Sequence, residues 1–170
     1  MRILITGGTG FIGRALVMRL LRRGDALTVL SRDPPKAAAL LGDRVRIWES
    51  LGQWRADTAF DAVINLAGEP IIDKAWTPER KRLLLASRIG ITEQLLDGIR
   101  HCQQKPAVLL SGSAIGIYGD TGASVCTESS PPADDFAARL CRDWERAAEP
   151  AETLGIRTVF LRTGLVLHES

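Results

Sequence analysis

The chain has 170 residues, of which 45% are hydrophobic and 25% are charged, and its formal net charge is +2. These values are ordinary for one soluble globular domain, and so small a charge gives no reason to expect a nucleic-acid partner. The three cysteines are widely spaced and form no C-x-x-C pair, so they predict neither a disulfide framework nor a metal site. Because we find no leader peptide and no apolar run of ~20 residues, we expect a cytoplasmic protein without membrane contact, whose oligomeric state stays open.

The first predicted elements are a short apolar strand that begins at Ile3 and a turn with four glycines, which leads directly into a helix. Gly8, Gly10 and Gly13 fit G-x-G-x-x-G, in which one glycine makes the turn, one lets the backbone approach a pyrophosphate, and one lets helix and strand pack closely. The start of the helix then faces the phosphates. The pattern therefore predicts a dinucleotide site that includes Gly7, Gly8, Thr9, Gly10, Phe11, Ile12 and Gly13.

The residues after the second predicted strand bear on the choice of dinucleotide. An apolar-periodic helix runs from Phe11 until Gly24 ends it, and Ala26 to Leu30 reads as the second strand. An acidic residue at the end of this strand would bind a ribose 2′-hydroxyl, whereas an arginine accommodates a 2′-phosphate. Here Ser31 is followed by Arg32, which favours NADP over NAD. Asp33 remains the alternative if the strand runs longer, and Arg32 is then a solvated charge.

A small-residue turn follows the fourth predicted strand. Before it, Lys36 to Leu41 is predicted as a short helix, Arg44 to Trp48 as the third strand, and Glu49 to Ala59 as irregular. Phe60 to Gly68 is a buried strand that ends in small residues, which let the backbone pass close to a dinucleotide. We predict that this turn contacts the cofactor through Asn65, Leu66, Ala67 and Gly68, although Asn65 is equally well explained as satisfying local backbone groups.

The second half continues the alternation of helices and strands. After a loop at Ile71 to Thr77, Thr77 as N-cap and Pro78 as first helical residue predict a long helix to about His101. The remaining predictions are a strand from Pro106 to Ser111, a loop from Thr121 to Ala133, a helix capped by Asp134 or Asp135 through Glu149, and a strand from Ile156 to Arg162. The fold class is therefore α/β, a doubly wound parallel sheet of about six strands in the order 3-2-1-4-5-6 with helices on both faces, and residues 1–170 form one dinucleotide-binding domain.

With these motifs in place, the chain resembles the extended short-chain dehydrogenase/reductase superfamily. The resemblance rests on the segments 6–13, 65–68 and 111–119, and more narrowly, with 64–71, 87–89, 144–145 and 161–164, on an atypical and uncharacterised epimerase family within it. It implies a Rossmann fold and an NAD(P)-dependent oxidoreductase or epimerase-like activity. It also implies a C-terminal part that builds the substrate pocket, which this sequence lacks.

The catalytic pair of that superfamily is missing. Redox-active members use Tyr-x-x-x-Lys, in which the lysine favours ionisation of the phenol so that it exchanges a proton while hydride moves. The only tyrosine, Tyr118, has Gly122 four residues later, and the two expected helix positions fall at about Ala137 and Cys141. The candidate catalytic residues are therefore Ser113, which aligns with the substrate-orienting serine of the superfamily, and Tyr118. A turn serine and a loop tyrosine are the structural alternatives.

Two functional hypotheses follow. The first is an NADP-binding oxidoreductase or epimerase-like enzyme that acts on an unassigned small molecule, and it is favoured by the serine segment and Asn65. The second is an NADP-binding sensor or scaffold without catalysis, and it is favoured by the missing Tyr-x-x-x-Lys pair. Glu128, Asp134 and Asp135 near the mouth of the site are better explained as loop or capping residues, and Cys141 as a buried helix residue.

Overall fold

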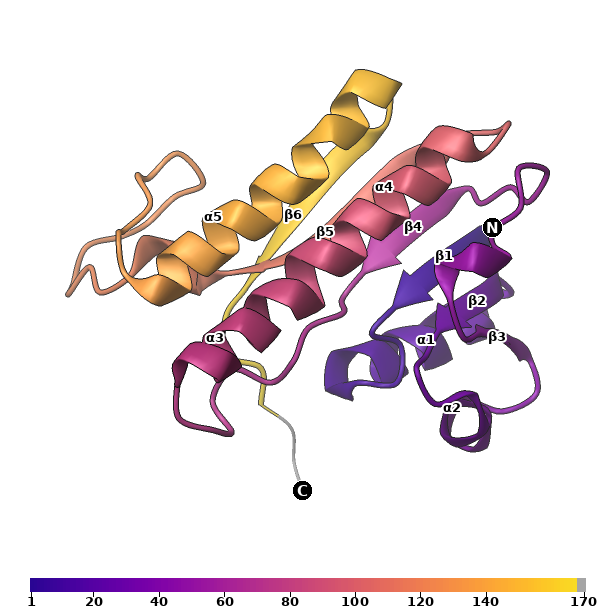
Figure 1. The fold of residues 1–170 in the computed structure, drawn as a ribbon, viewed down its shortest axis with the longest axis horizontal. Coiled ribbons are helices and arrows are strands. Elements are labelled where there is room, and N and C mark those ends of the chain that lie inside the picture. The colour runs from indigo at the N-terminus through magenta and orange to yellow at the C-terminus, as the bar shows by residue number, and fades with distance from the viewer. Residues whose placement is uncertain (168–170) are drawn as a thin grey trace.

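The computed structural model describes residues 1–167, so residues 168–170 of the predicted domain lie outside it. Six parallel strands form one sheet in the order β3-β2-β1-β4-β5-β6, which confirms the predicted fold class and strand order (Figure 1). The strands are β1 (Arg2–Thr6), β2 (Ala26–Leu30), β3 (Val45–Trp48), β4 (Ala62–Asn65), β5 (Val108–Ala114) and β6 (Arg157–Thr163). The order reverses between β1 and β4, and in such sheets ligands bind at the carboxyl ends of the strands at this point.

Helices cover both faces of the sheet. On one face lie α1 (Phe11–Arg23) and α2 (Pro34–Leu41), and on the other lie α3 (Pro78–Leu85), α4 (Ile91–His101) and α5 (Phe136–Ala148) (Figure 1). Short helical turns occur at η1 (Leu51–Gln53), η2 (Ala86–Gly90), η3 (Ile115–Tyr118) and η4 (Glu149–Leu154). In the described part of the chain, no helix is long and apolar enough to cross a membrane.

Alternation along the strands divides the core into two layers. Ile3 and Ile5 pack towards α1 and α2, whereas Leu4 between them packs towards α4 and α5, and all three are almost completely buried. Successive side chains of a strand point to opposite faces, so a short apolar run such as residues 3–5 can fill both layers. At about 25 cal/mol per Å² of apolar surface, this two-sided burial is the main stabilising term of the fold.

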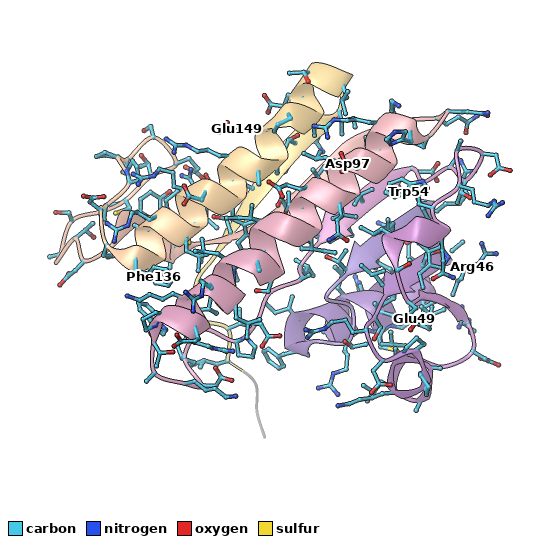
Figure 2. The ribbon with its side chains drawn as sticks, in the orientation of Figure 1. Arg46, Glu49, Trp54, Asp97, Phe136 and Glu149 are labelled. Atoms are coloured by element: carbon cyan, nitrogen blue, oxygen red, sulfur yellow. The ribbon has the colours of Figure 1, made fainter. Side chains whose placement is uncertain are left out.

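Helix α3 and the loop before it pack against the first residue of α5. The rings of Trp76 and Phe136 meet edge to face with centroids 5.1 Å apart, and the Lys81 ammonium lies 4.9 Å from the centre of the Phe136 ring. Figure 2 shows Phe136 where α5 begins, beside α3. Asp135 is the N-cap of α5, because its carboxylate accepts from the Ala138 N–H at 2.8 Å.

Several boundaries differ from the predictions; for example, β4 covers only Ala62–Asn65 of the predicted Phe60 to Gly68, and β5 begins at Val108 instead of Pro106. Three further differences have a clear physical reason or bear on the site. Helix α2 begins at Pro34 instead of Lys36, because Asp33 caps it and accepts from the Lys36 N–H at 3.1 Å. Strand β5 runs on to Ala114, because its pairing with β6 continues through the serine segment. The helix predicted from Pro78 to about His101 is present but contains the π-helical segment η2. A π segment within an α-helix often marks a functional site.

Candidate functional site

A cleft of about 640 Å³ runs along the carboxyl ends of β2, β1 and β4, at the point where the strand order reverses. It is lined by part of the glycine turn after β1, by the start of α2, by the turn after β4 and by the π segment η2. Of the predicted cofactor-binding residues, those that line it are Gly7, Thr9, Gly10, Arg32, Leu66, Ala67 and Gly68.

The glycine turn is packed so closely that side chains are excluded at two positions. Gly7 has a φ of +70°, and a Cβ placed there would lie 2.5 Å from the carbonyl carbon and oxygen of Leu66. A Cβ on Gly13 would lie 2.1 Å from the Gly7 carbonyl oxygen. The first contact ties the turn to β4, and the second lets α1 approach β1. Gly10 is the N-cap of α1, and a glycine cap leaves the helix start open to an anion.

The other predicted cofactor-binding residues lie near the cleft without lining it. Gly8 is buried against Val29, because a Cβ on it would lie 2.8 Å from a methyl group of that side chain. Phe11 and Ile12 are 46% and 42% exposed on the first turn of α1. Gly13 does not line the cleft, but its close contact with the Gly7 carbonyl oxygen shapes the glycine turn that does.

Asn65 is completely buried and lies in a hydrogen-bonded network behind the cleft. Its Oδ1 accepts from the Thr6 hydroxyl at 2.6 Å, and its Nδ2 donates to the Thr92 Oγ1 at 2.8 Å. The same Thr92 oxygen accepts from the Trp144 Nε1 at 3.2 Å and donates to the Arg88 carbonyl at 2.7 Å. The structure therefore places Asn65 as a link between β1, β4 and α4, and its bonds go mainly to side chains.

Thr92 tests the importance of this network. We expect Thr92→Val to lower the free energy of unfolding by roughly 2–5 kcal/mol, because each of two buried donors, on Asn65 and Trp144, loses its acceptor. Thr92→Ser keeps the hydroxyl and is expected to cost only about 1 kcal/mol, for the lost methyl group. Urea denaturation of the two variants measures the difference. Equal destabilisation by serine and valine would show that the hydroxyl is not needed.

Basic residues lie where β2 ends. Arg32 and Lys36 both line the cleft, and the side chain of Arg32 is 89% exposed, with its Nη2 3.1 Å from the Glu69 carboxylate. Strand β2 ends at Leu30, as the sequence predicts, and Asp33 caps α2. The longer strand that the Asp33 alternative assumed is not present, although Asp33 itself also lines the cleft. Because the Arg32 side chain is so exposed, its ion pair with Glu69 contributes only about 0–1 kcal/mol. Arg32 can therefore leave Glu69 for a phosphate at little cost.

A buried arginine, Arg80, holds the segment after β4 that forms part of the rim of the cleft. Arg80 is 7% exposed and donates to Asp73 at 2.7 Å, to the Pro70 carbonyl and, at 3.4 Å, to Glu69. In the π segment, the Ser87 hydroxyl lines the cleft and accepts from the Glu69 N–H at 3.1 Å, and Arg88 donates to the Glu69 carbonyl at 3.0 Å. Burial lowers the pKa of Arg88.

A second polar group lies at the carboxyl ends of β5 and β6 and contains both predicted catalytic residues. The Ser113 hydroxyl donates to Glu145 Oε1 at 2.5 Å, and Arg162 binds the same carboxylate in a fork, from Nε to Oε1 and from Nη2 to Oε2, both at 2.9 Å. The remaining Nη1 donates to the Tyr118 hydroxyl at 2.8 Å and to the Glu128 carbonyl at 2.9 Å. Ser113 and Arg162 are register partners across the β5–β6 pair. We call Ser113, Tyr118, Glu145 and Arg162 the β5–β6 cluster.

Charge in the β5–β6 cluster is balanced. Burial works against ionisation of Glu145, but the hydrogen bonds from Arg162 and Ser113 outweigh it, so the net effect lowers the pKa of this carboxyl. The bonds to Glu145 in turn raise the pKa of Arg162. Both groups are therefore charged at neutral pH. Because Ser113 is 5% exposed and donates its proton to Glu145, its hydroxyl can offer a ligand only a lone pair.

Glu145 and Arg162 were not predicted as site residues, although one signal for Glu145 is present in the sequence. Glu145 follows Cys141 by four residues, so it lies on the apolar side of its helix, where an ionised side chain needs a partner. Lys36 was also missed, because nothing in the local sequence distinguishes it from an exposed lysine at a helix start. Arg162 carries no such signal, since the residues of strand β6 do not alternate between apolar and polar and none of them is fully buried.

Neither a nucleophilic thiol nor a metal centre is found at the site. Burial raises the pKa of the Cys141 thiol, which favours the unreactive protonated form. Across residues 1–167 there is no group of three or more His, Cys, Asp or Glu side chains suited to a metal ion, and the cysteines of this region are all free.

Comparison with known sequences gives one family. The model of the NAD dependent epimerase/dehydratase family matches residues 3–167. The chain is 37% identical over 174 residues to the chloroplastic epimerase family protein SDR39U1 homologue of Arabidopsis thaliana. The aligned region covers 98% of this chain and 49% of that protein. The chain is also 37% identical to the epimerase family protein YfhF of Bacillus subtilis, over 99% of this chain and 56% of that protein. The chain thus spans about half the length of these curated relatives.

Comparison with solved structures agrees with the sequence comparison, because it also finds an epimerase family protein. Human epimerase family protein SDR39U1 (isoform 2), crystallised with NADPH, matches with a TM-score of 0.85 at 33% identity, over 100% of this chain and 56% of that chain. UDP-glucuronic acid 4-epimerase from Bacillus cereus, crystallised with NAD, matches with a TM-score of 0.74 at 21% identity, over 96% of this chain and 57% of that chain. At 21% identity this second likeness shows the fold alone.

Proposed function

The chain belongs to the NAD-dependent epimerase/dehydratase family, and from this premise we propose that it binds NADP in the cleft and catalyses an oxidoreductase or epimerase-like reaction on a small molecule. The observation that carries the proposal is the cleft itself. It combines a turn in which Gly7 and Gly13 leave no room for a Cβ with two basic side chains at the end of β2.

The residues that line the cleft fit each part of such a dinucleotide. The pyrophosphate would bind at the glycine turn and the start of α1, where backbone N–H groups and the helix dipole favour an anion. Arg32 and Lys36 would bind the 2′-phosphate, and Ala37, Leu40 and Leu51 provide an apolar wall for a base. The turn at Leu66 to Gly68 would hold the half of the cofactor nearer to β4. The human relative crystallised with NADPH supports this choice.

Bound in this way, the dinucleotide would supply hydride transfer to or from a carbonyl or alcohol carbon. The chain's own contribution would be to orient the reacting group and to move a proton at its oxygen. Ser113 and Tyr118 are the residues proposed for these roles, because both lie in the β5–β6 cluster on the same edge of the sheet as the cleft.

A second candidate function is an NADP-binding sensor or scaffold. It is supported by α5, where Ala137 and Cys141 stand at about the positions of the usual tyrosine and lysine, and where Cys141 is buried. Following NADPH oxidation in the presence of a panel of aldehydes and ketones separates the two candidates. Turnover supports the enzyme, whereas tight binding without turnover supports the sensor.

Arg32 tests the choice of dinucleotide. We expect the wild-type chain to bind NADPH more tightly than NADH, and Arg32→Ala to weaken NADPH binding by about 10- to 100-fold, since a charge-assisted contact contributes ~1.5–3 kcal/mol. Binding of NADH should change by less than about twofold, because it has no 2′-phosphate. Quenching of the fluorescence of the four tryptophans measures both affinities.

Arg46 is a matched control for this substitution. It is an exposed arginine on the edge strand β3 that does not line the cleft, and it is labelled in Figure 2. Arg46→Ala should leave both affinities unchanged. A wild-type preference for NADH would refute the role of Arg32, and binding of neither dinucleotide would overturn both candidate functions.

A further inference from the structure

Tyr118 ends η3, just past the carboxyl end of β5, and it is the only tyrosine of the chain. Its oxygen accepts a hydrogen bond from Arg162 Nη1 at 2.8 Å. Among residues 1–167, no acceptor is found for its own hydroxyl proton. The phenol is partly exposed, so its proton is available to a ligand.

Arg162 meets Tyr118 and Glu145 through different edges of its guanidinium. Nε and Nη2 face the Glu145 carboxylate, and Nη1 faces the phenol oxygen. The centre of the guanidinium also lies 5.4 Å from the centre of the Tyr118 ring. A cation placed directly against a phenol oxygen stabilises the negative charge that develops there when the proton leaves. The carboxylate and the Glu128 carbonyl hold the guanidinium in this orientation.

Arg88 lies between the rim of the cleft and α5, the helix that carries Glu145. This side chain donates to the Glu69 carbonyl at the rim of the cleft, and its guanidinium lies 5.3 Å from the ring of Trp144. Trp144 directly precedes Glu145 on α5. The glycine turn, the β4 turn and the cluster therefore follow one another along the same edge of the sheet, in the strand order β1, β4, β5 and β6.

We propose that Tyr118 is the proton-transfer residue of this site, with Arg162 as the cation that stabilises its ionised form and Glu145 as the positioning residue for Arg162. The pair of Tyr118 and Arg162 would then perform the task for which α5 carries no tyrosine and lysine. Ser113 donates its proton to Glu145 and keeps a lone pair to orient a substrate hydroxyl. This inference rests on the proposed dinucleotide-dependent function and names the acid and base that it requires.

The proton and electron balance of the step is simple. When a carbonyl carbon receives hydride from a reduced nicotinamide dinucleotide, the Tyr118 O–H bond breaks and a new O–H bond forms at the carbonyl oxygen. The carbonyl is reduced to an alcohol, and the dinucleotide is oxidised. The phenolate stays paired with Arg162 until water returns its proton. The reverse reaction uses the same phenolate to take the proton of an alcohol.

Because the chain has a single tyrosine, its phenolate absorbance band reports on Tyr118 alone. Of the charged groups near this phenol, Arg162 from β6 contacts its oxygen, Glu145 from α5 contacts Arg162, and the Asp135 carboxylate lies beside the adjacent Gly119. The test is a titration of that band, without any cofactor, in the wild type, in Arg162→Lys and in the double variant Arg162→Gln/Glu145→Gln. The double variant removes both charges together, so that no buried charge is left unpaired. Circular dichroism at each pH confirms that the chain is folded.

We expect the phenolate band of the double variant to need a higher pH than that of the wild type, because Arg162 contacts the phenol oxygen directly whereas Glu145 contacts only Arg162, and that of Arg162→Lys to stay near the wild type. An unchanged titration in the double variant would overturn the role of Arg162. With any carbonyl compound that the chain reduces, Tyr118→Phe should lower kcat by about 10²- to 10⁴-fold, and an unchanged kcat would overturn the role of Tyr118. The titration needs no dinucleotide, so its failure is distinguishable from failure of NADPH binding.

Discussion

Replacing Gly13 with alanine is expected to disrupt the turn and to weaken NADPH binding by about 5- to 100-fold. The added Cβ would lie 2.1 Å from the Gly7 carbonyl oxygen and 2.8 Å from the Gly8 Cα, and both contacts are with backbone. Neither contact is relieved by a rotamer change, so α1 must move away from β1. Overpacking of this kind costs about 1–3 kcal/mol or more. Thermal unfolding and NADPH titration measure the two effects.

Gly90 is the control for this substitution. It lies in the π segment with φ −60° and ψ −39°, and a Cβ added there would meet nothing within 4 Å. We expect Gly90→Ala to raise the free energy of unfolding by about 0.4–1 kcal/mol, because alanine restricts the unfolded chain. If Gly13→Ala and Gly90→Ala behaved alike, the close packing of the turn would not matter for stability or binding.

Replacing Arg162 with methionine is expected to lower the free energy of unfolding by about 3–5 kcal/mol at neutral pH. The Glu145 side chain is only 9% exposed, and Arg162 provides two of the three hydrogen bonds to its carboxylate. Removing one partner of a buried pair leaves the other charge without compensation, which costs far more than the pair contributes when intact. Urea denaturation with circular dichroism measures the loss.

The loss of stability caused by Arg162→Met should become smaller in acid, and the direction of this change follows from the pKa of Glu145. In the wild type this pKa is lowered from its usual 4.5, so the carboxylate stabilises the fold above that pH and loses this contribution as the pH falls through the folded-state value. In Arg162→Met, burial acts without the arginine and raises the pKa of Glu145, so acid relieves the penalty. The difference in stability between the two proteins is therefore expected to narrow from pH ~7 to pH ~4.

An exposed ion pair is the control for Arg162. The side chains of Arg82 and Glu79 are 74% and 75% exposed, at 3.1 Å from each other. Arg82→Met should change stability by less than about 0.5 kcal/mol, because water screens such pairs. A loss in Arg162→Met that is equally small, or that does not depend on pH, would mean that Glu145 finds another partner.

The fold was predictable because short-range patterns decide it. In the apolar run from Ile3 to Ile5, Leu4 belongs to one layer of the core, and Ile3 and Ile5 belong to the other. The glycines that follow indicate a turn between strand and helix. The crossover rule then leaves few arrangements of six parallel strands. Boundaries were less certain where capping chemistry decides them, as with Asp33 and Pro34 at the start of α2.

The candidate site was predictable only where its residues follow one another along the chain. Gly7 and Arg32 belong to local motifs, and both line the cleft. The pairing of Glu145 with Arg162 joins a helix to a strand, and no spacing rule indicates which buried charge meets which. Asn65 shows the same limit, because its position at the end of a strand suggested a ligand contact, whereas the structure turns its amide towards Thr92.

The π segment η2 has a consequence for how this protein tolerates changes in length. Each residue of an α-helix turns it by about 100°. A π-helical turn holds one residue more than an α-helical turn, so losing one residue between Ala86 and Gly90 would close this segment into an ordinary α-helix. Leu95, Leu96 and Ile99 would then stay in the core, and Thr92 would stay beside Asn65. The same loss within α4 would turn these residues away, so over evolution the chain length should vary more readily at η2 than within α4.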